Sequence, residues 1–379
     1  MIDAGSGIVP LGKLLLQEKV SKTHLLFTHY HHDHTQGLLL CPATYNASMR
    51  FDVYGPQEEG FGPKQMLEHI MRTPFHPVNF KEVAVRFSCY CLEVPTTIVL
   101  VFHPEGGVKK VAVHELDGVQ ERVPSQIAIG KGRYNIAECL VVRMLYSYHP
   151  ERTISYRFEE RTTGNVFVFL TDHENLDQTP VRLRSHLKDA DLLVMDSQYS
   201  RGQYDTWAAG FGHGTPDYCV RTAKAVGAAR LGLTHHDPLS TDEVVREILD
   251  VAQNKADRTS YGPERVFVCQ DYLEVEGLVQ SYPVQATDTN VRQSNSGRPV
   301  RAAFKLPNGN NNGKHNTRDQ ASEILTINIK KATELKELGR YELRVSKILI
   351  TSGNSKQLSR GAKWPQSVSL ISSTSMPKA

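Results

Sequence analysis

The segment His29-Tyr30-His31-His32-Asp33-His34 places four of the chain's 16 histidines within six residues. Imidazole and carboxylate groups are common ligands of Zn(II), Mn(II) and Fe(II), and this segment has no thiolate that would narrow the choice. His29 and His31, two residues apart in an extended loop, can turn toward one ion. Asp33 and His34 must then diverge from that pair toward another ion. One short segment therefore predicts a two-metal centre.

Three further donors follow apolar, β-branched runs elsewhere in the chain. VVRMLYSY leads to His149, VFVFLT to Asp172 and ARLGLT to His235. Parallel or mixed sheets gather strand ends at one edge, so donors that are far apart in sequence can meet there. Taken alone, His149 is more simply a packed histidine. Together with the His29–His34 segment, the repeated strand-then-donor pattern predicts convergence on one site.

The elements that would position these donors alternate between strands and helices. Strands are predicted at residues 24–28, 140–148, 165–171, 191–195, 230–234 and 265–269. Thr215 followed by Pro216 is typical of a helix start, with the helix running to about Gly227. Ser240 to Glu243 predicts a capping box that opens a second helix. The chain is therefore expected to be an α/β protein.

The motif HYHHDH resembles the HxHxDH signature of the metallo-β-lactamase superfamily. IDAG, YHP, FLTDHE, GHGT and LTHHDP resemble the remaining motifs in order, across about residues 1–276. The resemblance implies an αββα sandwich with the metals at one edge. It further implies that His29, His31 and His149 hold one ion, that Asp33, His34 and His235 hold another, and that Asp172 bridges them. Asp3 then matches an aspartate that orients a ligand without binding metal.

Within that superfamily, a bridging aspartate and the lack of a cysteine ligand resemble the phosphodiesterase branch, which includes ribonuclease Z. Gly212-His213-Gly214-Thr215 and the acid after the apolar strand, Asp196, are similar to ribonuclease Z motifs, although that family has Glu at the latter position. The resemblance implies that His213 donates a proton to the leaving oxygen or stabilises the phosphoryl charge, with Asp196 holding its tautomer. We expect Asp33, Asp196 and His213 to be the catalytic residues.

The expected activity is hydrolysis of a phosphodiester by metal-bound hydroxide, with two divalent ions that we expect to be zinc, Mn or Fe being the alternatives. Cyclic nucleotides, small phosphodiesters and nucleic acid ends are the candidate substrates. Hydrolysis of a thioester or lactone is an alternative, because the same metals attack carbonyl groups. A third reading is an inactive, truncated domain whose basic tail binds an anionic partner. A homodimer is one assembly that the sequence allows.

The net charge of +3 over 379 residues conceals a division of the chain. Residues 291–379 carry 16 Lys and Arg against 5 Asp and Glu, which leaves a net charge of −8 for residues 1–290. We expect a catalytic domain over residues 1–276, a disordered linker over 277–322 and a basic tail of uncertain order over 323–379. Superfamily members usually place strands before IDAG, so the domain is expected to lack its first strands.

Composition excludes several classes of protein. A hydrophobic content of 40% with 22% charged residues is ordinary for a globular chain and excludes fibrous and wholly disordered proteins. The six cysteines form no CxxC pair, unlike a disulfide framework or a thiolate zinc site. No run approaches the roughly 20 apolar residues of a membrane-spanning helix, and MIDAGSG is unlike a signal peptide. These features favour a cytoplasmic protein without a membrane partner.

Overall fold

The protein is described by a computed structural model that covers residues 1–270, 273–275, 323–327 and 348–352. The predicted linker at 277–322 lies outside the described residues, as does the predicted tail apart from two strands. Those strands, β15 (Glu323–Ile327) and β16 (Ile348–Ser352), pair antiparallel, and β16 also pairs with β14 (Leu273–Val275). Among the described residues, no helix is long and apolar enough to cross a membrane.

The first sheet is parallel, in the order β1-β2-β3, and contains β1 (Lys22–Leu26), β2 (Arg50–Pro56) and β3 (Phe87–Leu92). The central strand β2 is buried along nearly its whole length, as expected for a parallel strand covered on both faces. Ile2 adds a parallel bridge to Leu26 on the other side of β1. The strand predicted at 24–28 begins and ends two residues earlier, so Phe27 and Thr28 already lead into the loop that carries the histidines.

The second sheet has eight strands in the order β13-β12-β11-β10-β9-β8-β4-β5. Its members are β4 (Ile98–His103), β5 (Gly107–Ala112), β8 (Leu140–Tyr146), β9 (Ile154–Glu160), β10 (Val166–Leu170), β11 (Leu192–Asp196), β12 (Leu231–Thr234) and β13 (Val266–Val268). Strands β10 to β13 are parallel, whereas β9 runs antiparallel to both β10 and β8. Because β8 and β10 are both antiparallel to β9, they run in the same direction as each other.

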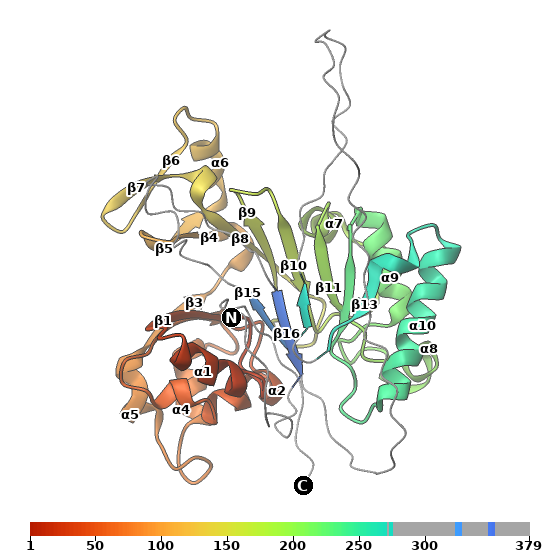
Figure 1. Ribbon diagram of the computed structural model, residues 1–379, viewed down its shortest axis with the longest axis horizontal. Coiled ribbons are helices and arrows are strands. Elements are labelled where there is room, and N and C mark those ends of the chain that lie inside the picture. Colours follow the sequence, from red (N-terminus) through yellow and green to blue (C-terminus); the bar gives the residue numbers. More distant parts are fainter. Residues whose placement is uncertain (271–272, 276–322, 328–347, 353–379) are drawn as a thin grey trace, which may run out of the picture. The chain divides into compact units, whose positions relative to one another are not determined.

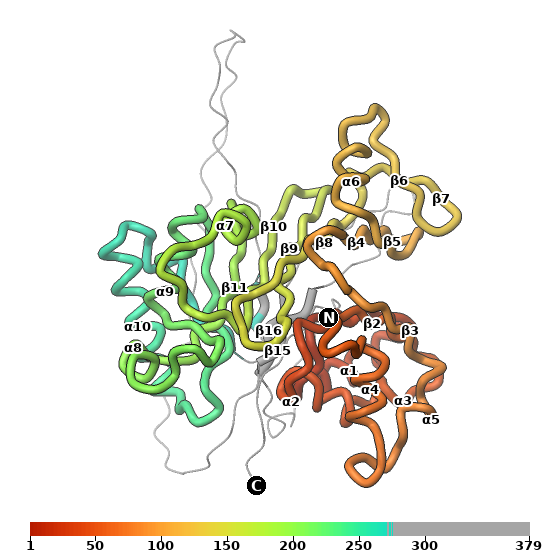
Figure 2. The backbone as a smooth tube through the Cα atoms, turned by 180° about the vertical axis from the view of Figure 1, so that it is seen from behind, coloured from red at the N-terminus to blue at the C-terminus, as the bar shows by residue number. Residues whose placement is uncertain are grey.

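The segment between the two halves of the domain contributes to both sheets. Strand β3 completes the first sheet, and β4 and β5 form one edge of the second. The remaining part is a hairpin of β6 (Gln126–Ile129) and β7 (Gly132–Asn135), which packs with α6 (Val113–Gln120) through a separate apolar cluster. This hairpin is the yellow projection of Figures 1 and 2.

The two sheets pack against each other and are covered by helices on their outer faces. The main core joins β1 and β2 to inward-facing residues of β8 to β11. Helices α7 (Val181–Leu187), α9 (Pro216–Val226) and α10 (Asp242–Arg258) bury a second core against the outer face of the large sheet. Helices α1 (Ile8–Gln17), α4 (Pro63–Ile70) and α5 (Phe80–Val83) lie beside the first sheet (Figures 1 and 2). The predicted αββα sandwich is confirmed.

The two predicted helix starts differ in how they are capped. Helix α9 begins at Pro216 and ends at Val226, and the next residue, Gly227, caps it with a φ of +74°, the left-handed conformation that glycine favours. Helix α10 begins one residue later than predicted, because the Thr241 hydroxyl accepts the Val244 N–H at 3.4 Å. Ser240 instead donates its backbone N–H to the Asp237 carbonyl in a preceding turn. The predicted capping box at Ser240 was therefore wrong.

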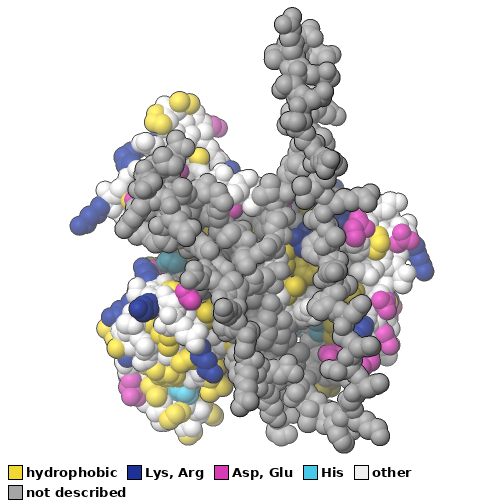
Figure 3. Space-filling view, viewed as in Figure 1, with side chains coloured by type: hydrophobic (Ala, Val, Ile, Leu, Met, Phe, Trp, Pro, Cys, Tyr) yellow, Lys and Arg dark blue, Asp and Glu magenta, His cyan; other side chains and the backbone are white. Residues whose placement is uncertain are grey.

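In the space-filling view, acidic side chains recur along the α9–α10 flank (Figure 3).

Candidate metal centre

The segment after β1 carries four predicted ligands in two different conformations. His29 and His31 lie in a segment without regular secondary structure, where His31 has extended backbone angles, and the short helix α2 (His32–Thr35) carries Asp33 and His34. Tyr30 holds the extended part in place by donating its hydroxyl to the Pro56 carbonyl at 2.8 Å. The change from extended chain to helix is the physical reason why the two pairs of donors face different directions.

The other predicted ligands lie beyond the carboxyl ends of second-sheet strands. His149 follows β8, Asp172 follows β10 and His235 comes directly after β12. These three strands run in the same direction, so their ends meet at one edge. Asp172 and His235 have φ values of +50° and +60°, conformations that cost a non-glycine residue about 1 kcal/mol or more. The fold therefore accepts backbone strain where it turns these side chains toward the edge.

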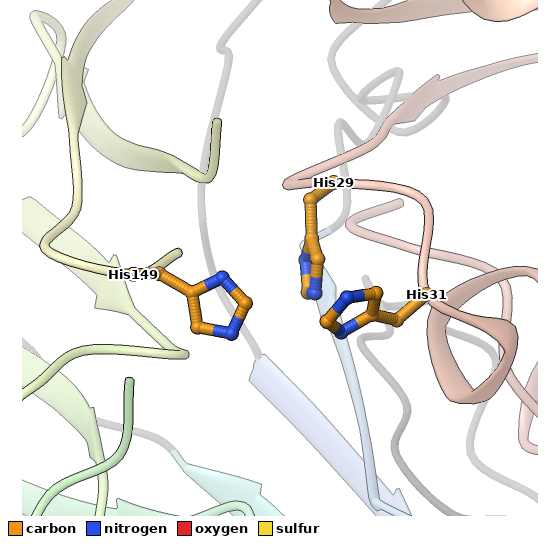
Figure 4. A group of neighbouring side chains, drawn as sticks. All are labelled: His29, His31 and His149. Carbon is orange, nitrogen blue, oxygen red and sulfur yellow. The ribbon is translucent and has the colours of Figure 1, made fainter. Parts of the chain in front are cut away.

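The structure brings all seven predicted ligands together. Within each of three groups, one ligand atom from every residue lies within 4.8 Å of the others: His29, His31 and His149; Asp33, His34 and His235; and His29, His34 and Asp172. Figure 4 shows His29 and His31 arriving from one loop and His149 from the opposite side, with the three rings turned toward one another. The first two groups are the two ligand sets expected from the sequence.

Asp172 lies between these two sets. Its Oδ1 is 3.8 Å from His29 Nε2, 3.9 Å from His149 Nε2 and 3.2 Å from His235 Nε2. Its Oδ2 is 3.5 Å from His34 Nε2. The carboxylate is 1% exposed, so both oxygens face the histidines and not water. This is the position that a bridging carboxylate requires.

Four of the histidines use Nδ1 for a neighbouring polar group, which turns Nε2 inward. The Nδ1 partners are Thr28 Oγ1 for His29 at 3.1 Å, Asp3 Oδ2 for His34 at 2.8 Å, Thr153 Oγ1 for His149 at 3.2 Å and Gln198 Oε1 for His235 at 3.1 Å. Such partners orient metal-binding imidazoles and raise their basicity. His31 is the exception, because its side chain is 46% exposed and its Nε2 faces Glu151 at 3.3 Å.

Asp3 has the orienting position expected for it. Besides contacting His34, its carboxylate accepts the Thr28 backbone N–H at 2.6 Å and the Thr28 hydroxyl at 2.8 Å. Burial raises the pKa of Asp3, although His34 and Thr28 oppose that rise. Its φ of +55° makes it a third left-handed residue at this edge.

The charges of the cluster fit divalent cations. Burial raises the pKa of Asp172, but the His235, His34 and His29 rings outweigh it and hold that pKa well below its usual value. Burial lowers the pKa of His34, but Asp33, Asp172 and Asp3 raise it well above its usual value. Buried carboxylates thus require compensating positive charge here, which bound cations also supply.

One ring nitrogen further supports this fit. Within the described part of the chain, the buried Nε2 of His29 has no hydrogen-bond partner. Burial, followed by the neighbouring His34, holds the pKa of His29 well below its usual value, which favours the neutral, metal-binding form of the ring. A buried and unsatisfied nitrogen is costly unless a ligand occupies it. The donors present therefore suit a metal centre, and their binding of metal stays a prediction.

His213 and Asp196 form a pair beside this cluster. Asp196 is 1% exposed at the end of β11, and its Oδ2 lies 2.7 Å from His213 Nδ1. The His213 ring stacks on that of His235, with centroids 4.9 Å apart. The shorter side chain of aspartate therefore still reaches the histidine. Because the carboxylate accepts from Nδ1, the proton-carrying or proton-accepting atom that remains is Nε2.

Two acidic residues near the centre had no role in the sequence-based prediction. Glu151 Oε2 lies 3.2 Å from His149 Nδ1 as well as 3.3 Å from His31 Nε2, so it bridges two predicted ligands. Glu174 accepts the Gly212 backbone N–H at 2.8 Å and also the Tyr204 hydroxyl. Their signal in sequence is only that each lies two residues after a predicted ligand.

The histidines that match no predicted ligand have different surroundings. His32 is exposed to solvent. His173 is buried, with Nε2 2.8 Å from the Tyr218 hydroxyl and Nδ1 accepting the Tyr148 N–H at 3.2 Å. Burial lowers the pKa of His173 to about 4, so it packs as a neutral ring. Neither residue is among the seven predicted ligands.

One family model and several solved structures match this chain. A family model described as "Beta-lactamase superfamily domain" matches residues 1–236. The metallo-β-lactamase fold protein YhfI from Bacillus subtilis is 19% identical over 70% of this chain and 82% of its own, with a TM-score of 0.41. Unliganded yeast PDE1 is 15% identical over 65% of this chain and 66% of its own, with a TM-score of 0.44.

The short form of human tRNase Z is 20% identical over 62% of this chain and 80% of its own, with a TM-score of 0.38. No curated protein was found to be similar to the chain. The family model spans the loop of His29 to His34, both sheets up to β12 and the last predicted ligand, His235. The chain therefore belongs to the β-lactamase superfamily.

Proposed function

We propose that this protein is a metal-dependent phosphodiesterase that acts on cyclic nucleotides, small phosphodiesters or nucleic acid ends. The observation that carries the proposal is the pair of His213 and buried Asp196, joined at 2.7 Å and stacked against the predicted ligand His235. For attack on a substrate, a metal-dependent hydrolase can rely on its metal site alone. The added imidazole indicates a reaction whose leaving group needs a proton.

In this proposal, His29, His31 and His149 hold one divalent ion and Asp33, His34 and His235 hold another, with Asp172 shared between them. When bound, two such ions supply a nucleophile at neutral pH and neutralise charge on the attacked group. Zinc is the expected metal, with Mn or Fe as alternatives, because histidine and carboxylate donors suit all three. The central position of Asp172 and the inward Nε2 atoms support this division of ligands.

The role of His213 follows from its tautomer. Asp196 accepts from Nδ1, which leaves Nε2 to give a proton to the leaving oxygen or to stabilise phosphoryl charge. An alkoxide leaving group is strongly basic and gains much from such an acid. A thiolate is far less basic, so thioester hydrolysis has less use for His213. The pair thus favours a phosphodiester over a thioester.

The test is metal analysis of the purified full-length protein followed by assays on three classes of substrate. We expect about two metals per chain and hydrolysis of bis(p-nitrophenyl) phosphate that exceeds hydrolysis of thioesters and lactones. A folded, metal-loaded sample without activity on any phosphodiester would contradict the proposal. Greater activity on acyl substrates would favour the carbonyl alternative.

Two neighbouring histidines provide a matched control for the ligand set. His31→Ala removes a predicted ligand, and His32→Ala removes the adjacent side chain, which is also exposed. We expect His31→Ala to lose metal content and activity, while His32→Ala keeps both. Equal losses in the two variants would show that the motif matters for folding and not for metal binding.

A further inference from the structure

A chain of aromatic rings leads from His213 to the protein surface. The Tyr199 ring lies edge-on to His213 with centroids 5.8 Å apart, and edge-on to Trp207 with centroids 5.1 Å apart. Trp207 in turn contacts Phe211 at 6.1 Å. Tyr199 is only 6% exposed, whereas Trp207 and Phe211 are 50% and 53% exposed. We call the two exposed rings, Trp207 and Phe211, the aromatic patch.

The backbone that carries the aromatic patch is held in place from two sides. Glu174, two residues after the predicted ligand Asp172, accepts the Tyr204 hydroxyl and the Gly212 N–H. Gly212 has a φ of +91°, and a Cβ there would collide with the His149 ring, so the backbone packs directly on that ring. Residues Tyr204–Ala208 also form a π-helical turn, a conformation frequent at functional sites. The exposed rings therefore belong to a segment fixed to the metal centre.

Such a patch is unusual for a surface without a ligand. Exposed hydrophobic side chains are normally scattered singly, but these two rings contact each other and continue inward through Tyr199. A Trp or Phe ring can stack on any nucleobase, because every base has a π face. Tyr199 is the ring between the aromatic patch and His213, with centroid distances of 5.1 Å to Trp207 and 5.8 Å to His213, so the patch lies near the predicted metal centre.

We propose that the aromatic patch, Trp207 and Phe211, binds the nucleobase of a nucleotide phosphodiester whose phosphate lies at the metal centre. This inference rests on the proposed function and narrows it from phosphodiesters in general to those that carry a nucleoside. Tyr199 supports Trp207 from beneath, and Glu174 is a positioning residue that keeps the patch in register with His213. The apolar rings receive the uncharged base, while the charged phosphate faces the buried ligand cluster.

The first experiment compares two substrates with the same leaving group. Thymidine 5′-(p-nitrophenyl phosphate) carries a base, and ethyl p-nitrophenyl phosphate does not. We expect the wild-type protein to prefer the thymidine ester in kcat/KM, and the variant Trp207→Ala/Phe211→Ala to lower that preference at least about tenfold, mainly through KM. Phe75→Ala is the control, because Phe75 is 76% exposed and its ring lies beneath the Arg72 guanidinium, outside the aromatic patch. It should leave the preference unchanged.

The second experiment measures binding without catalysis. The chain has two tryptophans, so in a full-length Trp364→Phe variant Trp207 is the sole tryptophan fluorophore. Thymidine 5′-monophosphate should quench its emission saturably, and 2-deoxyribose 5-phosphate, which lacks the base, should not. Equal quenching by both compounds, or quenching by neither, would overturn the inference.

The outcomes separate this inference from the proposed function. Base-dependent quenching without any phosphodiester hydrolysis would retain the aromatic patch as a nucleobase site and contradict the phosphodiesterase. Hydrolysis of both p-nitrophenyl esters with no preference for thymidine, and no change in Trp207→Ala/Phe211→Ala, would contradict the patch alone. In that case a protein partner for the two rings becomes the better explanation.

Discussion

The two halves of the domain supply predicted ligands in opposite ways. The first half provides four of them from one loop and one helical turn after β1. The second half provides one from each of three strand ends, β8, β10 and β12, which are separated by many residues. The first set is therefore local in sequence, and the second is assembled by sheet topology.

This difference appears in the backbone and in the orienting groups. In the second half, Asp172 and His235 both have positive φ values. In the first half, the predicted ligand His34 lies in the short helix α2 and contacts Asp3, whose φ is positive. A buried carboxylate orients His34, while the amide of Gln198 orients His235. For this pair of histidines, the orienting group is charged in the first half and neutral in the second.

The largest expected effect comes from the residue that joins the two halves. Asp172→Ala removes the carboxylate that faces histidines of both sets, so we expect loss of both metals. The fall in kcat/KM should exceed about 10⁴-fold, which is the most that loss of a general acid typically costs. Metal content by elemental analysis is the measurement. Asp189→Ala is a matched control, because Asp189 also has a positive φ, of +51°, but is exposed. Retention of both metals in Asp172→Ala would show that the halves bind independently.

His213→Ala tests whether a second-half residue outside the ligand set acts only on the reaction. We expect the metals to stay bound and the rate to fall about 10²–10⁴-fold on a substrate with an alcohol leaving group, such as a cyclic nucleotide. The loss should be much smaller on bis(p-nitrophenyl) phosphate, whose leaving phenolate is weakly basic. Equal losses on both substrates would indicate charge stabilisation in place of proton donation. Metal loss would show that His213 is a ligand.

The contrast between the orienting groups can be measured directly. Asp3→Asn keeps the size of the side chain but removes its charge, and we expect metal affinity to fall about 10–100-fold in a chelator competition. Gln198→Ala removes the neutral partner of His235 and should cost less. A larger effect for Gln198→Ala would reverse the comparison. Thermal unfolding of both variants serves as the control for folding.

The last prediction concerns the pH dependence of stability and a second-half histidine outside the predicted ligand set, His186. Burial, followed by Arg157 and Arg143, lowers the pKa of His186 to about 3, and its Nε2 contacts Ser155 Oγ at 3.1 Å. Between its ordinary pKa of 6.5 and about 3, the unfolded chain binds the proton more tightly, so the free energy of unfolding falls as pH falls. The His186 contribution is thus fully present above pH 6.5.

In His186→Gln, the glutamine amide can still donate to Ser155 but does not titrate. As the pH falls from about 6.5 to 4, the free energy of unfolding should therefore fall by about 3 kcal/mol less in the variant than in the wild type. Denaturant unfolding at a series of pH values provides the measurement. Parallel pH profiles for the two proteins would show that His186 is already protonated or accessible in the folded state.

Much of this molecule could be predicted because its signals are local. The His29–His34 segment indicated two directions of ligands by spacing alone, and apolar runs located β8 and β10 to β13 to within about two residues. The αββα fold followed from the resemblance of ordered motifs to one superfamily. The cap of α10 was misplaced because Ser240 and Thr241 both have hydroxyl groups, and only the turn at Asp237 decides which of them is used.

The sequence by itself determined which side chains can bind metal and in which elements they lie, since donor chemistry and strand patterning are properties of short segments. Only the tertiary structure decided that Asp172 lies between the two ligand sets, that Asp196 reaches His213, and that Glu151 and Glu174 are near the centre. These contacts join residues from different strand ends and loops. Their distances depend on strand direction, sheet packing and left-handed backbone turns, which no short segment encodes alone.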